Sequence, residues 1–353
     1  MQLSIYGLTL VRIKFAYHRK IDPQIRSGNP YFTFAPPHAT LMVNETQKAD
    51  HMTPIKSIAC IGEAMIELAI TPEGSTVGVA GDTLNTAVYL HRLAPTLTVD
   101  YVTRVGDDPF STQITEFISD AGVGTKTIEV SPGGTPGLYA ITTAADGERS
   151  FTYWRSAAAA RGMFQTDGGT DFGVLDRYDA LYLSGISLAI LPQPVRLALI
   201  NYLRDTSATV IYDSNYRPNL WEDADTARAI TTALWERADI ALPSIDDEMA
   251  LFNEQADDVA ARFLARRGQG ALKRGPEGPL SLGSDVSQPY APAAKVVDTT
   301  AAGDSFNGAY FSARMVGLGP VEAAKAAHQM AARVITHRGA LMPMDLIRQE
   351  TAA

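Results

Sequence analysis

Strand-like and helix-like hydrophobic patterns alternate along this chain from Ile55 onward. Buried-strand patterns occur in IKSIACIG, VDYVTRVG, DALYLSG, ATVIYDSN and ADIALPS. Helical patterns occur between them, in TLNTAVYLHRLA from near Thr83, PFSTQITEFISDAG, QPVRLALINYLRDT and ADTARAITTALWERA. Because two parallel strands must be joined by a long crossover, usually a helix, this alternation leaves few possible folds. It predicts an α/β fold in which helices cover both faces of a mostly parallel central sheet.

One section, GLYAITTAADGERSFTYW, interrupts this alternation. It holds two short alternating runs around Asp146-Gly147, a dipeptide that suits a tight hairpin turn. A second pair of strands is predicted in MIELAI and STVGVAG. Four β segments without helices between them predict a small sheet that stands off the main one, over about residues 66–81 and 137–155. We expect this sheet to be a lid over a cleft; the alternative is an edge hairpin that extends the central sheet.

Residues 1–51 differ from the rest of the chain in charge and in pattern. They carry six basic and three acidic residues, a net charge of +3. Because the whole chain has a net charge of −9, the remaining residues carry −12. They show no sustained period of 3.6 or 2, and proline interrupts them repeatedly. The apolar run LSIYGLTLV is followed by its basic residues and lacks a small-residue cleavage site, which argues against a secretory signal. We expect residues 1–51 to be an extension outside the catalytic fold, which residues 52–353 would form.

Composition excludes several classes of protein. The 353 residues can form one large α/β domain or two smaller ones. The net charge of −9 argues against nucleic-acid partners and anionic membrane surfaces, and no run of 18 apolar residues predicts a membrane span. The lone cysteine, Cys60, lies in a strand pattern and has no internal disulfide partner. We therefore expect a cytoplasmic protein in which Cys60 is a core residue.

Several familiar motifs are missing or isolated. The chain has no P-loop, and no G-x-G-x-x-G follows a strand pattern. The tripeptide DFG at Asp171–Gly173 occurs without the other protein-kinase motifs, so we attribute it to chance. The six histidines show no metal-ligand spacing, and for His91 and His328, which lie in helical patterns, we expect a surface or packing role.

The segment KVVDTTAAGDSFNGAY passes from a strand-like run, Lys295–Val297, into a helical pattern. Ala301, Ala302 and Gly303 leave the backbone bare where that helix begins, so its free N–H groups and its dipole favour an anion. A phosphoryl group that is losing its leaving group is the strongest such anion. Asp304 then suits a base that takes the proton from an attacking hydroxyl. The alternative, that Asp298 or Asp304 caps its own helix, explains either acid alone but not the whole string.

Two signatures carry a resemblance to a known family. DTTAAGDSFNGAY resembles the C-terminal signature of the ribokinase-like (PfkB) carbohydrate kinases, and VAGDTLNTAVYLHRL resembles their N-terminal sugar-binding signature. RVGDDPFSTQITEFISDAGV and LKRGPEG follow in the family's order, so the resemblance covers about residues 55–340. It implies a ribokinase-like three-layer α/β/α fold with a β-sheet lid. It also implies ATP-dependent phosphorylation of a sugar hydroxyl, with magnesium.

Further segments resemble one subgroup of that family, the 2-keto-3-deoxygluconate kinases. These are IGEAMIEL, GERSFTYWRSAAAAR and YDSNYRPNLW, and in this subgroup Ala takes the place that Gly has in most relatives, as at Ala301. The resemblance implies phosphorylation of the C6 hydroxyl of the sugar acid. Its implied sites are Asp304 with Ala301, Ala302 and Gly303 for catalysis; Gly81, Asp82 and Asn85 for the sugar hydroxyls; Tyr139, Tyr153, Arg155 and Arg217 for the rest of the substrate; and Ser244, Lys273, Gly275 and Gly278 for the nucleotide.

These implied contacts also have a physical basis, and each has an alternative. The guanidinium fork of arginine fits a carboxylate, so Arg217 would face the acid group; a surface ion pair is the alternative for Arg155 and Arg217. For Asp82 and Asn85, which precede or begin a helix, the alternative is helix capping. Tyr153 and Trp154 alternate on a predicted strand, so one should face the cleft and the other should pack away.

The chain departs from the family at the element N-x-x-E, which appears here as PSIDDE. Ser244 replaces the asparagine, and either Asp247 or Glu248 would organise the metal through water. The expected partners are a sugar acid and ATP, with no nucleic acid and no membrane, and we expect a homo-oligomer. Two alternatives remain open: a kinase of fructose, ribose or 2-keto-3-deoxygalactonate, and a catalytically silent sugar sensor on the same fold.

Overall fold

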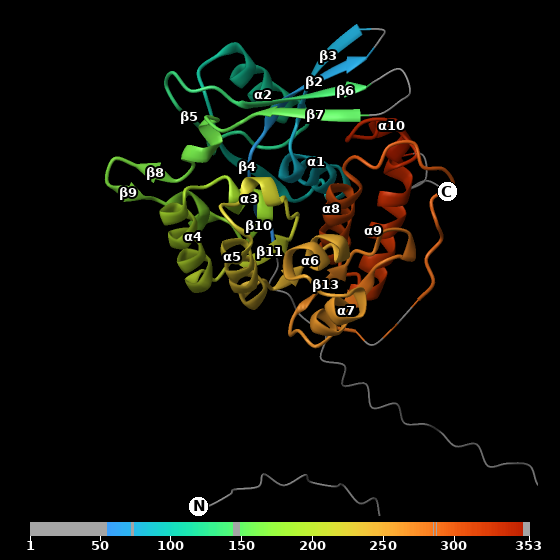
Figure 1. Ribbon diagram of the computed structural model, residues 1–353. Helices are drawn as coiled ribbons and strands as arrows, with labels where there is room; N and C mark the ends of the chain where they lie inside the picture. Colours follow the sequence, from blue (N-terminus) through green and yellow to red (C-terminus); the bar gives the residue numbers. More distant parts are fainter. Residues whose placement is uncertain (1–54, 72–73, 144–148, 285, 287, 349–353) are drawn as a thin grey trace, which may run out of the picture. The chain divides into compact units, whose positions relative to one another are not determined.

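The computed structural model describes residues 55–348 apart from 72–73, 144–148, 285 and 287 (Figure 1). The expectation for residues 1–51 and the predicted turn at Asp146-Gly147 lie outside the described residues. The α/β class and the mostly parallel central sheet are confirmed.

The central sheet has eight strands, and all neighbouring strands run parallel except β13 and β14. Its order is β14 (Leu280–Leu282), β13 (Gln269–Leu272), β12 (Ile240–Ala241), β11 (Thr209–Asp213), β10 (Ala180–Ser184), β1 (Ser57–Ile61), β4 (Thr98–Val105) and β5 (Ile128–Val130). Each of the five strands predicted from the sequence lies in this sheet. The sequence patterns did not indicate β5, β13 and β14.

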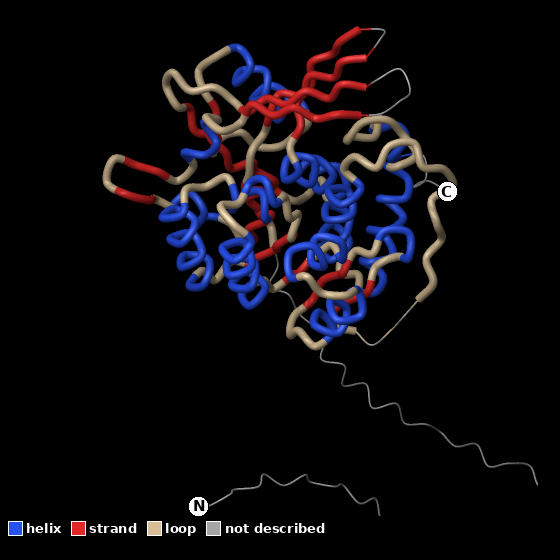
Figure 2. Tube along the Cα trace, in the orientation of Figure 1, coloured by secondary structure: helices blue, strands red, loops and turns tan. Residues whose placement is uncertain are grey.

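Successive side chains of the central strands enter two different apolar cores, which makes the structure three-layered. In β1, Ile58 and Cys60 belong to one core, and Ala59 and Ile61 belong to the other. The first core includes residues of α1 (Asp82–Leu93), α2 (Pro109–Asp120), α8 (Ala302–Met315), α9 (Pro320–Val334) and α10 (Met344–Arg348). The second includes residues of α3 (Gly185–Ala189), α4 (Gln193–Asp205), α5 (Ala224–Arg237), α6 (Ile245–Phe252) and α7 (Ala256–Leu264). Figure 2 shows the helices around the sheet.

A separate four-stranded sheet contains the two predicted strand pairs. Its order is β3 (Gly74–Ala80), β2 (Met65–Thr71), β6 (Gly137–Thr143) and β7 (Arg149–Trp154). The pairs β2–β3 and β6–β7 are antiparallel, whereas β2 and β6 are parallel. Since none of these strands pairs with the central sheet, the alternative of an edge hairpin is wrong. This sheet, hereafter the small sheet, stands beside the central one (Figure 1).

Short elements complete the described part of the chain. They are β8 (Gln165–Thr166) and β9 (Gly169–Thr170), which form a two-stranded sheet, and four 3₁₀ turns, η1 (Ala159–Gly162), η2 (Gly173–Arg177), η3 (Pro218–Leu220) and η4 (Gly275–Glu277). Among the described helices, none is both long and apolar enough to cross a membrane. Cys60 is fully buried and free, as expected for a core residue.

One sequence expectation is wrong. Lys295–Val297 is not a strand. Instead, the amide of Val297 donates a 2.7 Å hydrogen bond to the carbonyl of Ile335, the C-cap residue of α9. The segment therefore passes the end of a helix, and a carbonyl that has no partner within the helix accepts the hydrogen bond of the segment's backbone amide.

We expect a chain that starts at Met52 to keep the thermal stability of the full chain. Residues 1–51 lack hydrophobic periodicity and reverse the charge sign of the body, so their removal should uncover little apolar surface. Melting temperatures of the two chains, measured side by side, test this. A fall of several degrees in the shorter chain would mean that the extension packs on the domain or on a second copy of it.

Candidate active site

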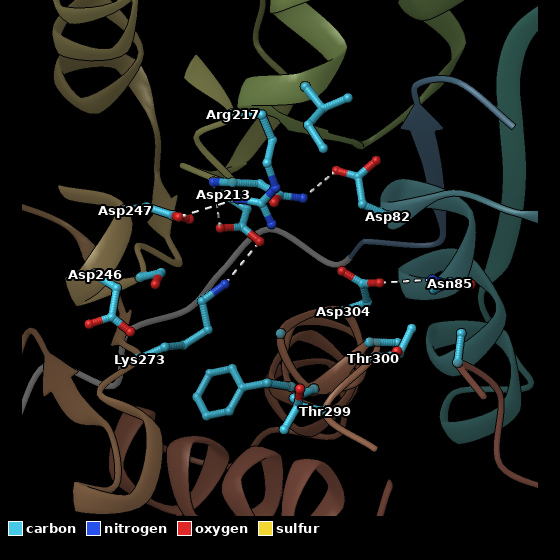
Figure 3. Close-up of a pocket in the computed structure, with 18 of the residues that line it drawn as sticks. Asp82, Asn85, Asp213, Arg217, Asp246, Asp247, Lys273, Thr299, Thr300 and Asp304 are labelled. Carbon is cyan, nitrogen blue, oxygen red and sulfur yellow. Dashed lines mark hydrogen bonds and ion pairs between the residues drawn. The ribbon is translucent and has the colours of Figure 1, made fainter. Parts of the chain in front are cut away.

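A cavity of about 1410 Å³ lies where the carboxyl ends of the central strands meet the start of α8 (Figure 3). Asp213 ends β11, Ser244 follows β12, and Lys273 follows β13, and all three residues line the cavity. In open α/β sheets, ligands bind outside the carboxyl ends of the strands, because the loops there converge. Residues of the small sheet, including Tyr139 and Tyr153, line the same cavity.

Helix α8 begins inside this cavity, as the sequence predicted. Its N-cap is Ala301, which has a left-handed backbone with φ 60° and makes no side-chain cap. Within the described residues, no acceptor meets the amide N–H of Gly303 or of Asp304. Since Ala301, Ala302, Gly303 and Asp304 all line the cavity, the free amides and the positive end of the helix dipole face the space where a ligand can lie.

The Asp304 carboxylate does not cap α8. It accepts a 2.8 Å hydrogen bond from Asn85 Nδ2, which comes from α1, while the hydroxyl of Thr86 donates to the Asp304 carbonyl at 3.2 Å. Burial raises the pKa of Asp304 to about 8, and the charge of Asp82 adds to this increase. The capping alternative for Asp304 is therefore wrong, and so is the capping alternative for Asn85. A carboxylate with this pKa can accept a proton near neutral pH.

Side chains from two other parts of the chain hold the Asp82 carboxylate in place. One carboxylate oxygen accepts a 2.5 Å bond from Ser184 Oγ and a 2.7 Å bond from Asn215 Nδ2, and the side chain makes no cap on α1. The residue before it, Gly81, is the N-cap of α1, and a β-carbon there would lie 2.4 Å from the carbonyl oxygen of Glu63. The backbone of Glu63 therefore requires glycine at position 81, and this brings the start of α1 close to the small sheet.

A buried polar network holds Lys273 beside the start of α8. Lys273 Nζ pairs with Asp213 Oδ2 at 2.9 Å and donates to Asn307 Oδ1 at 3.1 Å. Asn307 in turn donates to the same Asp213 oxygen at 2.6 Å. The ammonium lies 3.8 Å from the place that a β-carbon on Gly303 would occupy, so a fixed positive charge adjoins the free amides. Figure 3 shows Lys273 directed toward Asp213 and Asp304 beside Asn85.

Aromatic side chains of the small sheet face the cavity. The rings of Tyr139 and Tyr153 stack with centroids 5.7 Å apart, and the Tyr139 hydroxyl donates to Glu67. Tyr153 lines the cavity, as one of the two alternating residues was expected to do. Trp154 does not line it, but the expectation that Trp154 packs away is wrong, because this side chain is 58% exposed.

The two predicted arginines both line the cavity, and each is paired with an acid of the protein. Arg155, whose side chain is 11% exposed, pairs with the fully buried Glu63. Arg217 lies 3.3 Å from Asp247 and also donates to the carbonyl of Tyr216 at 2.7 Å. The ion pair of Arg155 is therefore a buried one, whereas Arg217 is half exposed and keeps part of its guanidinium free for a ligand.

The residues predicted for the nucleotide and the metal divide into two groups. Ser244, Lys273, Gly275 and Asp247 line the cavity. Glu248 and Gly278 do not line it. Glu248 is fully buried and accepts bonds from Arg262 and Trp235, so its charge is already compensated away from the cavity. A β-carbon on Gly278 would overlap the ring of Tyr290, which explains glycine there by packing.

Some cavity residues were missed by the sequence analysis. Asp213, Asp246 and His328 line the cavity, and the ring of His328 packs on Tyr290 with centroids 5.0 Å apart. The helical pattern predicts only a surface or packing role for His328, and its packing on Tyr290 agrees with that prediction. The one available signal was for Asp213, whose position at the end of a predicted strand places it at the ligand-binding edge.

Comparison with known proteins places the chain in a family. Residues 55–346 match the pfkB family of carbohydrate kinases. The 2-dehydro-3-deoxygluconokinase of Dickeya dadantii is 42% identical over 82% of this chain and 98% of its own length. That of Haemophilus influenzae is 36% identical over 82% of this chain and 96% of its own. A PfkB protein from Polaromonas is 26% identical, with a TM-score of 0.69 over 83% of this chain and 99% of that one. This chain belongs to the pfkB family of carbohydrate kinases.

Proposed function

We propose that the protein transfers the γ-phosphoryl group of ATP to the C6 hydroxyl of 2-keto-3-deoxygluconate, giving 2-keto-3-deoxy-6-phosphogluconate. The observation that carries the reaction type is Asp304, a carboxylate with a raised pKa beside free helix amides. The substrate is supported by the relatives named 2-dehydro-3-deoxygluconokinase, which are 36–42% identical to this chain over 82% of its length.

In this reaction, Asp304 accepts the proton of the C6 hydroxyl as its oxygen forms a bond to the γ-phosphorus. The bond from that phosphorus to the β–γ bridging oxygen breaks, and ADP leaves with the electron pair. The amides of Gly303 and Asp304 and the ammonium of Lys273 stabilise the negative charge on the transferring group. Asn85 holds the Asp304 carboxylate in place, since its amide donates to one carboxylate oxygen.

The acidic lining of the cavity fits a magnesium ion bound together with the nucleotide. The described residues hold no group of three or more acidic, histidine or cysteine side chains that could bind a metal by itself. Mg²⁺ typically keeps several waters and uses one or two carboxylates in addition to substrate phosphates. Asp247 lines the cavity and would act through water, whereas Glu248 is not placed to do so. When bound, the ion would neutralise phosphate charge.

We expect the rate at low substrate concentration to fall as the pH falls below about 8. The base must be ionised to accept a proton, and the pKa of Asp304 is raised from 3.8 to about 8. Each unit below that pKa should reduce kcat/KM about tenfold, because the ionised fraction falls by that factor. A profile of kcat/KM between pH 5 and 9 tests this. A plateau that extends down to pH 5 would contradict the raised pKa of Asp304.

On the substrate side, we propose that Gly81, Asp82 and Asn85 contact the sugar, with Tyr139, Tyr153 and Arg155 on the side of the small sheet. Arg217 would face the carboxylate. The small sheet, about residues 66–81 and 137–155, would act as a lid, because its aromatic side chains line the cavity. The homo-oligomer, the cytoplasmic location and the role of residues 1–51 stay predictions from the sequence.

A coupled assay for ADP release tests the proposed function across a panel of sugars. The panel contains 2-keto-3-deoxygluconate, its C4 epimer 2-keto-3-deoxygalactonate, fructose and ribose. We expect kcat/KM to be highest for 2-keto-3-deoxygluconate. Equal activity on fructose or ribose would indicate a general sugar kinase of this family, and binding of sugar without ADP release would indicate a sugar sensor.

A further inference from the structure

Four arginines line the cavity, and one of them has no acidic partner. Arg155 is paired with Glu63, Arg217 with Asp247, and Arg274 with Glu277. The fourth, Arg161, was not predicted to be a site residue. Within the described residues, its guanidinium makes no hydrogen bond or ion pair. Arg161 therefore brings a positive charge to the cavity that the described part of the protein does not neutralise by contact.

The backbone that carries Arg161 is held in place although the side chain is free. Arg161 lies in η1, which directly follows the strand β7 and the loop at Arg155. The amide of Ala159 donates to the carbonyl of Thr135 at 2.9 Å, and Ala160 is only 2% exposed. A free charged group on an anchored turn can bind a ligand at a small entropic cost, because only the side chain must be ordered.

Contacts show the order of groups along the cavity. Arg155 pairs with Glu63, and a β-carbon on Gly137 would lie 2.5 Å from the Glu63 carboxylate. The turn that carries Arg161 is bonded to Thr135, close to Gly137 in the chain, so it lies on the Glu63 side.

Helix α1 connects this side to the proposed base. A β-carbon on Gly81 would lie 2.4 Å from the carbonyl oxygen of Glu63, and Asn85 in the first turn of α1 donates to Asp304. Asp82, which begins α1, therefore lies between the two arginines and Asp304. The pKa shifts agree with this order: after burial, Arg155 and Arg161 lower the pKa of Glu63, and Asp82 raises the pKa of both Glu63 and Asp304.

This order matches a linear substrate that has a carboxylate at one end and the reacting hydroxyl at the other. The hydroxyl belongs at Asp304, and the middle hydroxyls belong near Asp82. The carboxylate then belongs at the end where Arg155 and Arg161 lie. Arg155 is already bound to the buried carboxylate of Glu63, so its charge is largely compensated. Arg161 is the cation at this end whose charge is still available.

We propose that Arg161 contacts the carboxylate of the substrate and determines the preference of this site for a sugar acid over a neutral sugar. This inference rests on the proposed function and extends it to a residue for which the sequence predicts no role. The guanidinium would donate hydrogen bonds to the carboxylate oxygens, as arginine does in other carboxylate sites.

The test measures KM for 2-keto-3-deoxygluconate and for ATP in the wild type and in Arg161→Met. The methionine keeps most of the apolar stem and removes the charge. We expect KM for the keto acid to rise about tenfold or more, and KM for ATP to change less than about twofold. KM does not depend on the fraction of folded protein, so a partly unstable variant still gives an answer. Arg161→Lys keeps the charge without the fork and should recover part of the affinity.

Arg177→Met is the matched control, because Arg177 is exposed in another 3₁₀ turn and does not line the cavity. It removes the same charge and should leave both KM values unchanged. An unchanged KM for the keto acid in Arg161→Met overturns the inference, and so does a rise confined to ATP, which would assign Arg161 to the phosphates. If the wild type does not phosphorylate the keto acid at all, the proposed function itself fails, and this is seen before any variant is measured.

Discussion

Asp304→Asn is expected to reduce turnover by about 10²–10⁴-fold, with little change in the affinity for the sugar or for ATP. Asparagine has almost the same shape as aspartate and can still accept the hydrogen bond that Asn85 donates at 2.8 Å. It cannot accept a proton from the attacking hydroxyl. The effect should therefore appear in kcat, whereas the free amides and Lys273, which are proposed to contact the phosphoryl group, remain in place. Steady-state kinetics with both substrates varied separate the two quantities.

The matched control for this variant is Asp120→Asn, which makes the same chemical change at an exposed position at the end of α2. Its kcat should equal that of the wild type. If Asp304→Asn lost folded protein but kept the specific activity of the folded fraction, Asp304 would be a structural residue and not the base.

The same substitution should also change how stability depends on pH. The pKa of Asp304 is raised in the folded protein, so the folded state holds this proton more tightly than the unfolded state. The stabilisation that the proton gives is complete below pH of about 4 and is lost as the pH rises through about 8. The asparagine side chain does not titrate and has no such loss, so Asp304→Asn should gain stability relative to the wild type as the pH rises between these values. Melting curves at pH 5 and pH 9 measure the difference.

The layers of the fold and the start of α8 could be predicted from the sequence. Both follow from local patterns: alternating strand and helix periods predict a parallel sheet, and small residues before an acid predict an open helix terminus. The role of Asp304 as a base could be predicted without knowing which distant residues lie near it. Its raised pKa could not be predicted, because it depends on burial and on Asp82, which is more than 200 positions away in the chain.

The partners of the cavity residues could not be predicted from the sequence. Arg155 and Glu63 are 92 residues apart, and Asn307 and Asp213 are 94 apart, so no local pattern connects them. The sequence also cannot show which of two adjacent acids faces the cavity. Asp247 and Glu248 are neighbours on α6, but a helix turns about 100° for each residue, so one faces the cavity and the other is buried against Arg262.

Arg217→Ala is expected to raise KM for 2-keto-3-deoxygluconate and to reduce the preference for the acid over uncharged sugars. Losing a charge-assisted hydrogen bond costs about 1.5–3 kcal/mol, or about ten- to 150-fold in affinity. Because the Arg217 side chain is 53% exposed, we expect the lower end of this range. Arg228→Ala is the control: Arg228 is also paired with an aspartate, Asp225, but does not line the cavity.

Arg217 is close to phosphate-side groups as well, so the experiment must separate two roles. Arg217 lies 3.3 Å from Asp247 in the first turn of α6, and Ser244 at the start of this helix forms a backbone bridge with Lys273, so Arg217 is near the Lys273 network. A rise in KM for ATP, with KM for the keto acid unchanged, would assign Arg217 to the nucleotide. A rise confined to the keto acid would support its contact with the carboxylate. The double variant Arg161→Met/Arg217→Ala then decides whether both arginines contact one carboxylate, because two residues that share a partner give non-additive effects.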